Sequence, residues 1–220
     1  MSNDKIQETT EATKNPLLQP YNTPFESIPF DKIELAHILP AIKEGIKMEQ
    51  LQIVAITDNS EAATFENTII PFEKTGETIS KVTSVLNTYM NVRNDEEIQK
   101  ISEEAYSLLT EHRNNIYLDK KLFSKIKQVY TNADTTLNGE QRRLLQTIYE
   151  NFVAAGANLD EKQKEKYREL TQKLNKLELK FQENTLKETD SFSLHITDKE
   201  QLDGLPESLV ESAALAAKEA

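Results

Sequence analysis

The sequence feature that most constrains the fold begins at Asp160. Asp160 and Gln163 form a capping box, in which side chains satisfy the free N–H groups of a helix start. The helix is predicted to continue to about Lys187. Its apolar residues recur at alternating steps of three and four: Tyr167, Leu170, Leu174, Leu177 and Phe181. This spacing favours antiparallel packing against another helix. The stripe has too few heptads for a long-lived dimeric coiled coil.

The preceding helix is the predicted partner of this stripe. It starts at Asn138, carries Leu145, Ile148 and Phe152 on one side, and ends at Gly156, a typical helix stop. The short link ANLD should make the two helices antiparallel neighbours. The side chains predicted to be buried against this helix are Leu170, Leu174, Leu177 and Phe181.

Two helices are predicted nearer the N-terminus. Pro40 is expected to be the first residue of a helix that ends near Thr57, because proline has no N–H to satisfy at that position. A second helix opens at Thr64, whose hydroxyl can cap the N–H of Asn67. Pro71 comes too late to belong to the first turn, so it should kink or split this helix.

Three further helix starts follow along the chain. The box at residues 94–97 begins one helix, Asp119 precedes another, and Pro206 opens a last one that runs to the end of the sequence. We find no sequence repeat of 20–50 residues. The predicted fold is therefore mainly all-α, a multi-helix, bundle-like arrangement.

Composition agrees with this fold and excludes several functions. Glycine (5) and proline (7) are scarce among 220 residues, whereas good helix formers are abundant. The net charge of −11 disfavours nucleic acids and anionic membranes as partners. The chain has no cysteine, so thiolate metal sites are excluded. No apolar run is long enough to span a membrane.

The N-terminal region is predicted to consist of a flexible tail followed by an extended arm. Residues 1–14 are predicted to be a polar, flexible tail without the apolar core of a signal peptide. The proline-punctuated stretch that follows should drape over the helices as an extended arm. The arm's predicted anchors are Leu17, Leu18, Phe25, Ile28 and Phe30.

The segment FSLHIT, residues 192–197, alternates apolar and polar side chains as a half-buried strand does. A strand must pair, and no other segment alternates as cleanly. The unpaired strand and the uncapped last helix indicate that the chain is part of a longer protein. Pairing with the N-terminal arm, or an extended connector, is the alternative. The predicted domains are a helical N-terminal domain at 15–190 and, at 191–220, the truncated start of a following region.

The residues alone predict no catalytic or metal site. A zinc hydrolase helix needs two histidines four residues apart and a glutamate. His37, His112 and His195 show no such spacing, so each is interpreted as structural or as a surface residue. Neighbouring acids (Glu96–Glu97, Glu103–Glu104, Asp160–Glu161) follow from the acidic composition, and most lie in first turns. The sequence has no phosphate-binding loop or nucleophile elbow.

Six stretches together carry a family resemblance. They are NPLL (15–18), PFESIPF (24–30), TFENTIIPFEKTGE (64–77), FVAAGANLD (152–160), LNKLELKFQENTLKET (174–189) and LDGLPES (202–208). In this order they resemble the N-terminal region of the thimet oligopeptidase family of zinc metallopeptidases, most closely its bacterial peptidyl-dipeptidase Dcp branch. The resemblance covers nearly the whole chain from Asn15.

The resemblance implies a mostly helical protein with two halves beside a channel that admits short peptides. Members of this branch remove dipeptides from the C-termini of oligopeptides. Their zinc lies on an H-E-x-x-H helix in the C-terminal half, which this sequence does not reach. The resemblance therefore assigns no catalytic or metal residue here. It implies zinc in the full-length protein, and as partners the C-terminal catalytic half and short peptides.

Two functions stay open at this point. One is the channel-wall domain of such a peptidase, inactive alone. The other is a stand-alone helical peptide-binding or adaptor module without catalysis. The expected location is the cytoplasm, or the periplasm or envelope if a signal sequence was removed before Met1.

Overall fold

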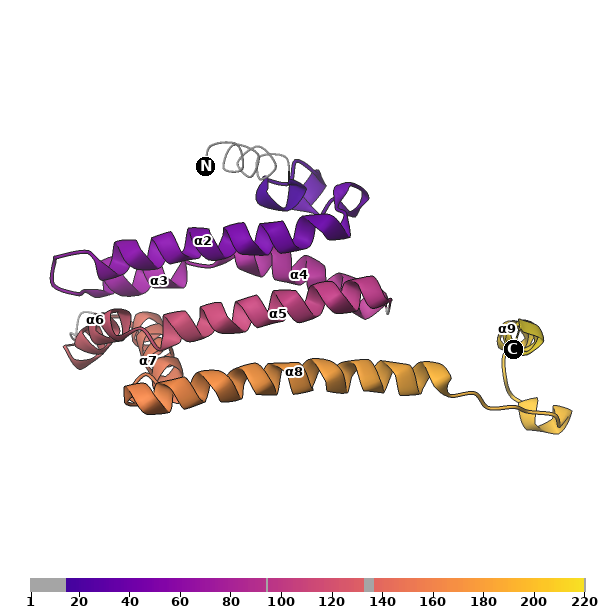
Figure 1. The fold of residues 1–220 in the computed structure, drawn as a ribbon. Helices are drawn as coiled ribbons and strands as arrows, with labels where there is room; N and C mark the ends of the chain where they lie inside the picture. Colours follow the sequence, from indigo (N-terminus) through magenta and orange to yellow (C-terminus); the bar gives the residue numbers. More distant parts are fainter. Residues whose placement is uncertain (1–14, 94, 133–136, 220) are drawn as a thin grey trace, which may run out of the picture. The chain divides into compact units, whose positions relative to one another are not determined.

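The computed structural model describes residues 15–93, 95–132 and 137–219. The chain divides into two compact units, residues 1–180 and residues 181–220. All regular secondary structure in the described residues is helical (Figure 1). The all-α prediction is therefore confirmed. The boundary at residues 190 and 191 remains a prediction.

The N-terminal arm is a series of short 3-10 turns: Pro16–Leu18, Pro24–Glu26, Phe30–Lys32 and Leu35–His37. Leu17 is fully buried, whereas Leu18 and Ile28 are half-buried and Phe30 is exposed on one side. The Phe30 ring contacts Tyr89 edge-on, with centroids 5.8 Å apart. Phe25 was wrongly predicted as an anchor. Its left-handed φ of 58° turns the side chain into solvent, where it is fully exposed.

Helix α2 (Ile38–Thr57) is the central element of the first unit and packs against α4 and α5. Pro40 is its third residue rather than its first. The position still lies in the first turn, where N–H groups have no partner within the helix. Ile42, Ile53 and Ile56 are buried, as their spacing predicts.

The helical path after α2 changes character next to Pro71, which lies in the first turn of α3 (Ile70–Glu73), and it is interrupted a few residues later, at residues 74–76. A π-helix (Phe65–Ile69) leads into α3, and α4 (Glu77–Val92) follows after a turn. Thr64 and Asn67 cap the start with reciprocal hydrogen bonds of 3.2 and 2.8 Å. Gly76 occupies the turn with φ 75°, a backbone conformation that glycine adopts readily.

Helices α5 (Glu96–Tyr117), α6 (Lys120–Thr131) and α7 (Gly139–Ala154) begin at local caps. Asp95 caps α5, one residue later than the predicted box start, and Asn94 lies outside the described residues. Asp119 caps α6 and Asn138 caps α7, both as predicted.

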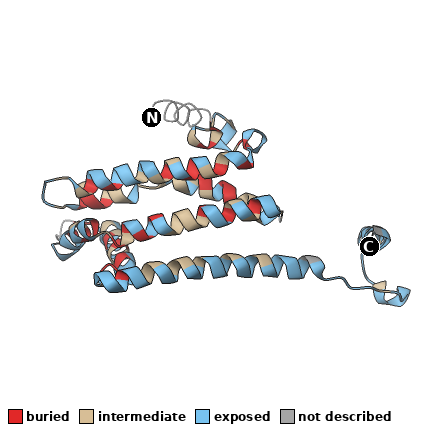
Figure 2. Ribbon diagram, viewed as in Figure 1, coloured by how far each residue is buried: buried red, intermediate tan, exposed pale blue. Residues whose placement is uncertain are grey.

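Two apolar cores hold the first unit together (Figure 2). One joins the arm, the first half of α2, α4 and the first half of α5. The other joins the end of α2, the π-helix, the end of α5, α6 and α7. Phe152 is fully buried in the second core, where its ring centroid lies 4.7 Å from that of Tyr117.

Helix α8 (Glu161–Ser191) contradicts the predicted contact with α7. Its start is the expected capping box of Asp160 and Gln163. The stripe residues Leu170, Leu174, Leu177 and Phe181 are all exposed, and Figure 2 shows α8 largely pale blue. The apolar face of α7 is instead covered by α6 and the segment around Phe72. The spacing correctly predicts that these residues share one helix face, but α7 does not cover that face.

The second unit contains the end of α8, a 3-10 turn (Lys199–Leu202) and α9 (Glu207–Glu219). Pro206 lies directly before α9. The strand predicted at residues 192–197 is wrong, since residues 192–198 have no regular structure. Phe192 and Leu194 are exposed, and no strand exists in the described part of the chain to pair with them.

Candidate functional site

The three histidines have different surroundings and different contact partners. His37 accepts a hydrogen bond from the backbone N–H of Glu34 through Nδ1 (3.0 Å), which fixes a turn of the arm. His195 is exposed in the irregular segment after α8. His112 is buried in α5, with Nε2 2.8 Å from Glu49 Oε2 on α2.

The adjacent acidic residues noted in the sequence lie on the surface or cap helices. Glu96 faces Lys100, Glu104 faces Lys43, and both pairs are exposed. The hydrogen bond from Lys120 lowers the pKa of Glu161. Among the described residues, no three His, Asp or Glu side chains come together as metal ligands. The described residues therefore offer no set of ligands for a zinc ion.

The Glu49–His112 contact belongs to a buried polar cluster at the break between α3 and α4. The hydroxyl of Thr75 donates to Glu49 Oε1 over 3.0 Å. A Cβ on Gly76 would lie 2.8 Å from the same oxygen, so the turn packs directly on the carboxylate. Glu49 thereby links α2, the turn and α5. No local sequence pattern indicates this cluster, because its members come from three separate segments.

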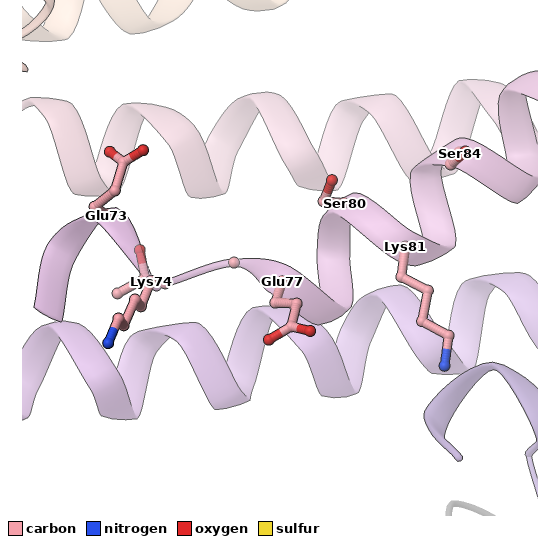
Figure 3. Close-up of a pocket in the computed structure, with 8 residues that line it drawn as sticks. Glu73, Lys74, Glu77, Ser80, Lys81 and Ser84 are labelled. Atoms are coloured by element: carbon pink, nitrogen blue, oxygen red, sulfur yellow. The ribbon is translucent and has the colours of Figure 1, made fainter. Parts of the chain in front are cut away.

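An open pocket of about 760 Å³ lies at this turn (Figure 3). In Figure 3, Glu73, Lys74 and Glu77 surround the turn, and Ser80, Lys81 and Ser84 project from the first half of α4. Thr75 and Gly76 complete the lining, so the pocket and the buried cluster share these two residues.

Among the charged side chains of the pocket, Lys81 is held in place by two contacts with the N-terminal arm. Its Nζ donates to the carbonyl of Gln19 (2.6 Å) and lies 3.6 Å above the ring of Tyr21. Burial lowers the pKa of Lys81, an effect opposed by the carboxylates of Glu77 and Glu26. Burial also raises the pKa of Tyr21. The arm therefore fixes the position of a cation at one end of the pocket.

The pocket can bind charged and polar groups, because its lining combines two ammonium groups, two carboxylates and three hydroxyls. None of its lining residues is a histidine or cysteine, so its hydroxyls have no neighbouring imidazole base. The lining groups can form hydrogen bonds and ion pairs. Residues 73–77 of the lining belong to the stretch TFENTIIPFEKTGE that carries the family resemblance, but no lining residue belongs to a motif with catalytic spacing.

No helix in the described ranges is both long and apolar enough to cross a bilayer. No family model matches the chain.

Comparison with curated proteins reveals clear relatives. The chain is 33% identical over 208 residues to the dipeptidyl carboxypeptidase of Escherichia coli (strain K12), a match covering 94% of this chain and 30% of that protein. The Salmonella typhimurium dipeptidyl carboxypeptidase is 32% identical over 206 residues, 93% of this chain and 30% of that protein. The organellar oligopeptidase A of Arabidopsis thaliana is 27% identical over 206 residues, 93% of this chain and 25% of that protein.

The chain thus spans about 30% of the length of its two bacterial relatives. The resemblance drawn from the six sequence stretches is confirmed by these matches. The chain belongs to the thimet oligopeptidase-like peptidase family, beside the bacterial dipeptidyl carboxypeptidases.

Proposed function

We propose that this chain forms the N-terminal, channel-wall part of a zinc metallopeptidase that removes dipeptides from the C-termini of oligopeptides. The observation that carries the proposal is the 33% identity, across 94% of the chain, to a protein named dipeptidyl carboxypeptidase. The match covers only 30% of that relative, so the proposed activity belongs to a longer protein.

The proposed division of labour assigns hydrolysis to the remainder of that longer protein. Peptide hydrolysis at a zinc ion needs a metal-bound water and a base beside it. Of the three histidines, all of which the structure describes, only His112 is buried, and its Nε2 lies 2.8 Å from Glu49 Oε2. The zinc and its ligands are therefore proposed to come from the C-terminal catalytic half.

The proposed contribution of this chain is shape and charge. Its first unit is held by two apolar cores, which give a helical body rigid enough to limit the width of a channel. The pocket beside Gly76 offers Lys74 and Lys81 to carboxylates and Glu73 and Glu77 to amines. Both kinds of charge occur on short peptides. As part of the same proposal, we place the protein in the cytoplasm, which cell fractionation tests.

The test compares residues 1–220 with the protein extended past Ala220 in the same reading frame. Each is incubated with a short peptide that has a free C-terminus, with and without a chelator, and dipeptide release is followed by mass spectrometry. We expect the extended protein to release dipeptides only without chelator, and the 220-residue chain to release none.

Chelator-sensitive cleavage by the 220-residue chain would overturn the assignment of hydrolysis to the missing half. An extended protein that binds peptides without cleaving them, or a reading frame that stops at Ala220, would favour a helical binding or adaptor module.

A further inference from the structure

Helix α8 presents its polar side to the body of the first unit. Lys164 is buried and donates to the carbonyl of Leu118 at the end of α5 (3.0 Å). Further bonds between the two helices, at 2.7–3.5 Å, are Arg168 to Asn115, Asn114 to Thr171, and a reciprocal pair between Gln172 and Ser107. Such specific polar contacts fix which way the helix faces.

The apolar side of the same helix faces away. Leu170, Leu174 and Leu177 are 53, 54 and 57% exposed, and Phe181, one turn further along the helix, is 72% exposed. We call these four residues the α8 stripe. Amphipathic helices of soluble proteins normally bury the apolar face and expose the polar one. Here the arrangement is reversed.

This reversal has an energetic consequence. Four large side chains, each more than half exposed on one helix face, leave several hundred Å² of apolar surface in water. Contiguous patches of that size on soluble proteins are typical of interaction sites. Burying them would contribute free energy that the 220-residue chain leaves unused.

A second copy of this chain is a poor occupant for the stripe. Lys166, Lys173 and Lys180 recur every seven residues along one edge of it. Two stripes packed antiparallel would bring these lysine rows against each other. The stripe is also too short for a stable parallel coiled coil, as its heptad count indicates.

We propose that the α8 stripe is the docking surface for the part of the longer protein that follows residue 220. This inference rests on the proposed function and deepens it by naming the contact between the two parts. The length outside this chain supports it, because the relatives are matched over only 30% of their length. The matched region also includes nearly the whole chain, so α8 lies within it.

Side-chain footprinting with hydroxyl radicals tests the proposal, because oxidation follows the solvent exposure of each side chain. The 220-residue chain and the extended protein are labelled side by side. We expect labelling of the stripe to fall at least about fivefold in the extended protein, as for anchor residues that become desolvated in an interface. Leu51 on α2 is 64% exposed and serves as the internal control, whose labelling stays unchanged.

A pair of substitutions gives a second, independent readout. Leu174→Glu with Leu177→Glu should leave the melting temperature of the 220-residue chain unchanged, since both side chains are in water there. In the extended protein the same pair should lower the melting temperature and restore labelling of Phe181. Leu51→Glu is the matched control and should do neither.

Each outcome decides the proposal separately from the proposed function. An extended protein that cleaves peptides while its stripe stays fully labelled overturns the docking surface and leaves the function standing. A protected stripe in an extended protein without peptidase activity overturns the proposed function and leaves the docking surface standing. A dimer of the 220-residue chain that the two glutamates dissociate would overturn the proposal in favour of a second copy. So would a reading frame that ends at Ala220, because no following segment could then cover the stripe.

Discussion

Two phenylalanines at opposite extremes of burial provide the sharpest test of this fold. Phe152 on α7 is fully buried, and Phe181 on α8 is 72% exposed. The ring of Phe152 has its centroid 4.7 Å from Tyr117, 5.4 Å from Phe72 and 6.0 Å from Phe123. Truncation at residue 152 therefore removes a side chain that joins three elements of one core.

The expected magnitudes follow from these environments. Phe152→Ala should lower the free energy of unfolding by about 3–5 kcal/mol, the sum of lost burial and the cavity left behind. Phe181→Ala in the 220-residue chain should change it by no more than about 0.5 kcal/mol, because its ring already contacts water. The two substitutions remove the same atoms, so their difference isolates burial from residue type.

Urea unfolding followed by far-ultraviolet circular dichroism measures both values, with the unfolding slope compared among variants. A cost below about 1 kcal/mol for Phe152→Ala would show that the second core is not packed as described. Equal costs for the two variants would refute the exposure of the α8 stripe. The burial of Phe181 predicted from the sequence would instead assign a large loss to that residue as well.

Three further predictions concern local features. Gly76→Ala should lower the free energy of unfolding by about 1–2 kcal/mol because of the left-handed backbone alone, and by more because the new Cβ would contact the carboxylate of Glu49. Thermal unfolding measures this loss. Asn138→Ala removes the cap of α7 and should cost about 1 kcal/mol, measured by the same method; no loss would mean that the cap is not formed. The backbone N–H of Ile98, together with Arg93, lowers the pKa of Asp95. Its stabilising effect is therefore present above its unfolded-state pKa and is lost as pH falls through the lower folded value. Asp95→Asn should reduce the acid-side loss of stability, and an Asp95 carboxyl that titrates at its ordinary pKa by NMR would contradict this.

Helix starts were predictable because their causes are local. Asp119, Asn138 and Asp160 each cap N–H groups within three residues of themselves, so the sequence alone contains both partners of the bond. The change from π-helix to α-helix next to Pro71 has the same character, since the proline ring and its missing N–H act on its own helix, although the break itself follows at residues 74–76. The prediction for Asn94 missed by one residue, and the cap is Asp95.

The strand expected at residues 192–197 failed for a different reason. Alternation states which side chains would share a face, but a strand exists only when another segment satisfies its backbone groups. Phe25 shows a similar limit. Its apolar character predicted burial, whereas the conformation of the turn around it decided that the side chain points outward.

The buried pair of Glu49 and His112 lay beyond sequence reasoning. The two residues are 63 positions apart on different helices, and neither has a partner of matching chemistry on its own helix face. Only the packing of α2 against α5 brings the carboxylate and the imidazole together. The same packing places Gly76 and the pocket beside them.

Helix α8 shows most clearly which features follow from the local sequence and which follow from tertiary packing. The spacing of Leu170, Leu174 and Leu177 is enough to predict that they share one helix face, because the α-helical period depends only on local backbone geometry. That this face points away from α7 depends on tertiary packing, because the hydrogen bonds between α8 and α5 turn the polar side inward. A helical period defines a face, but the elements packed around it determine what covers that face.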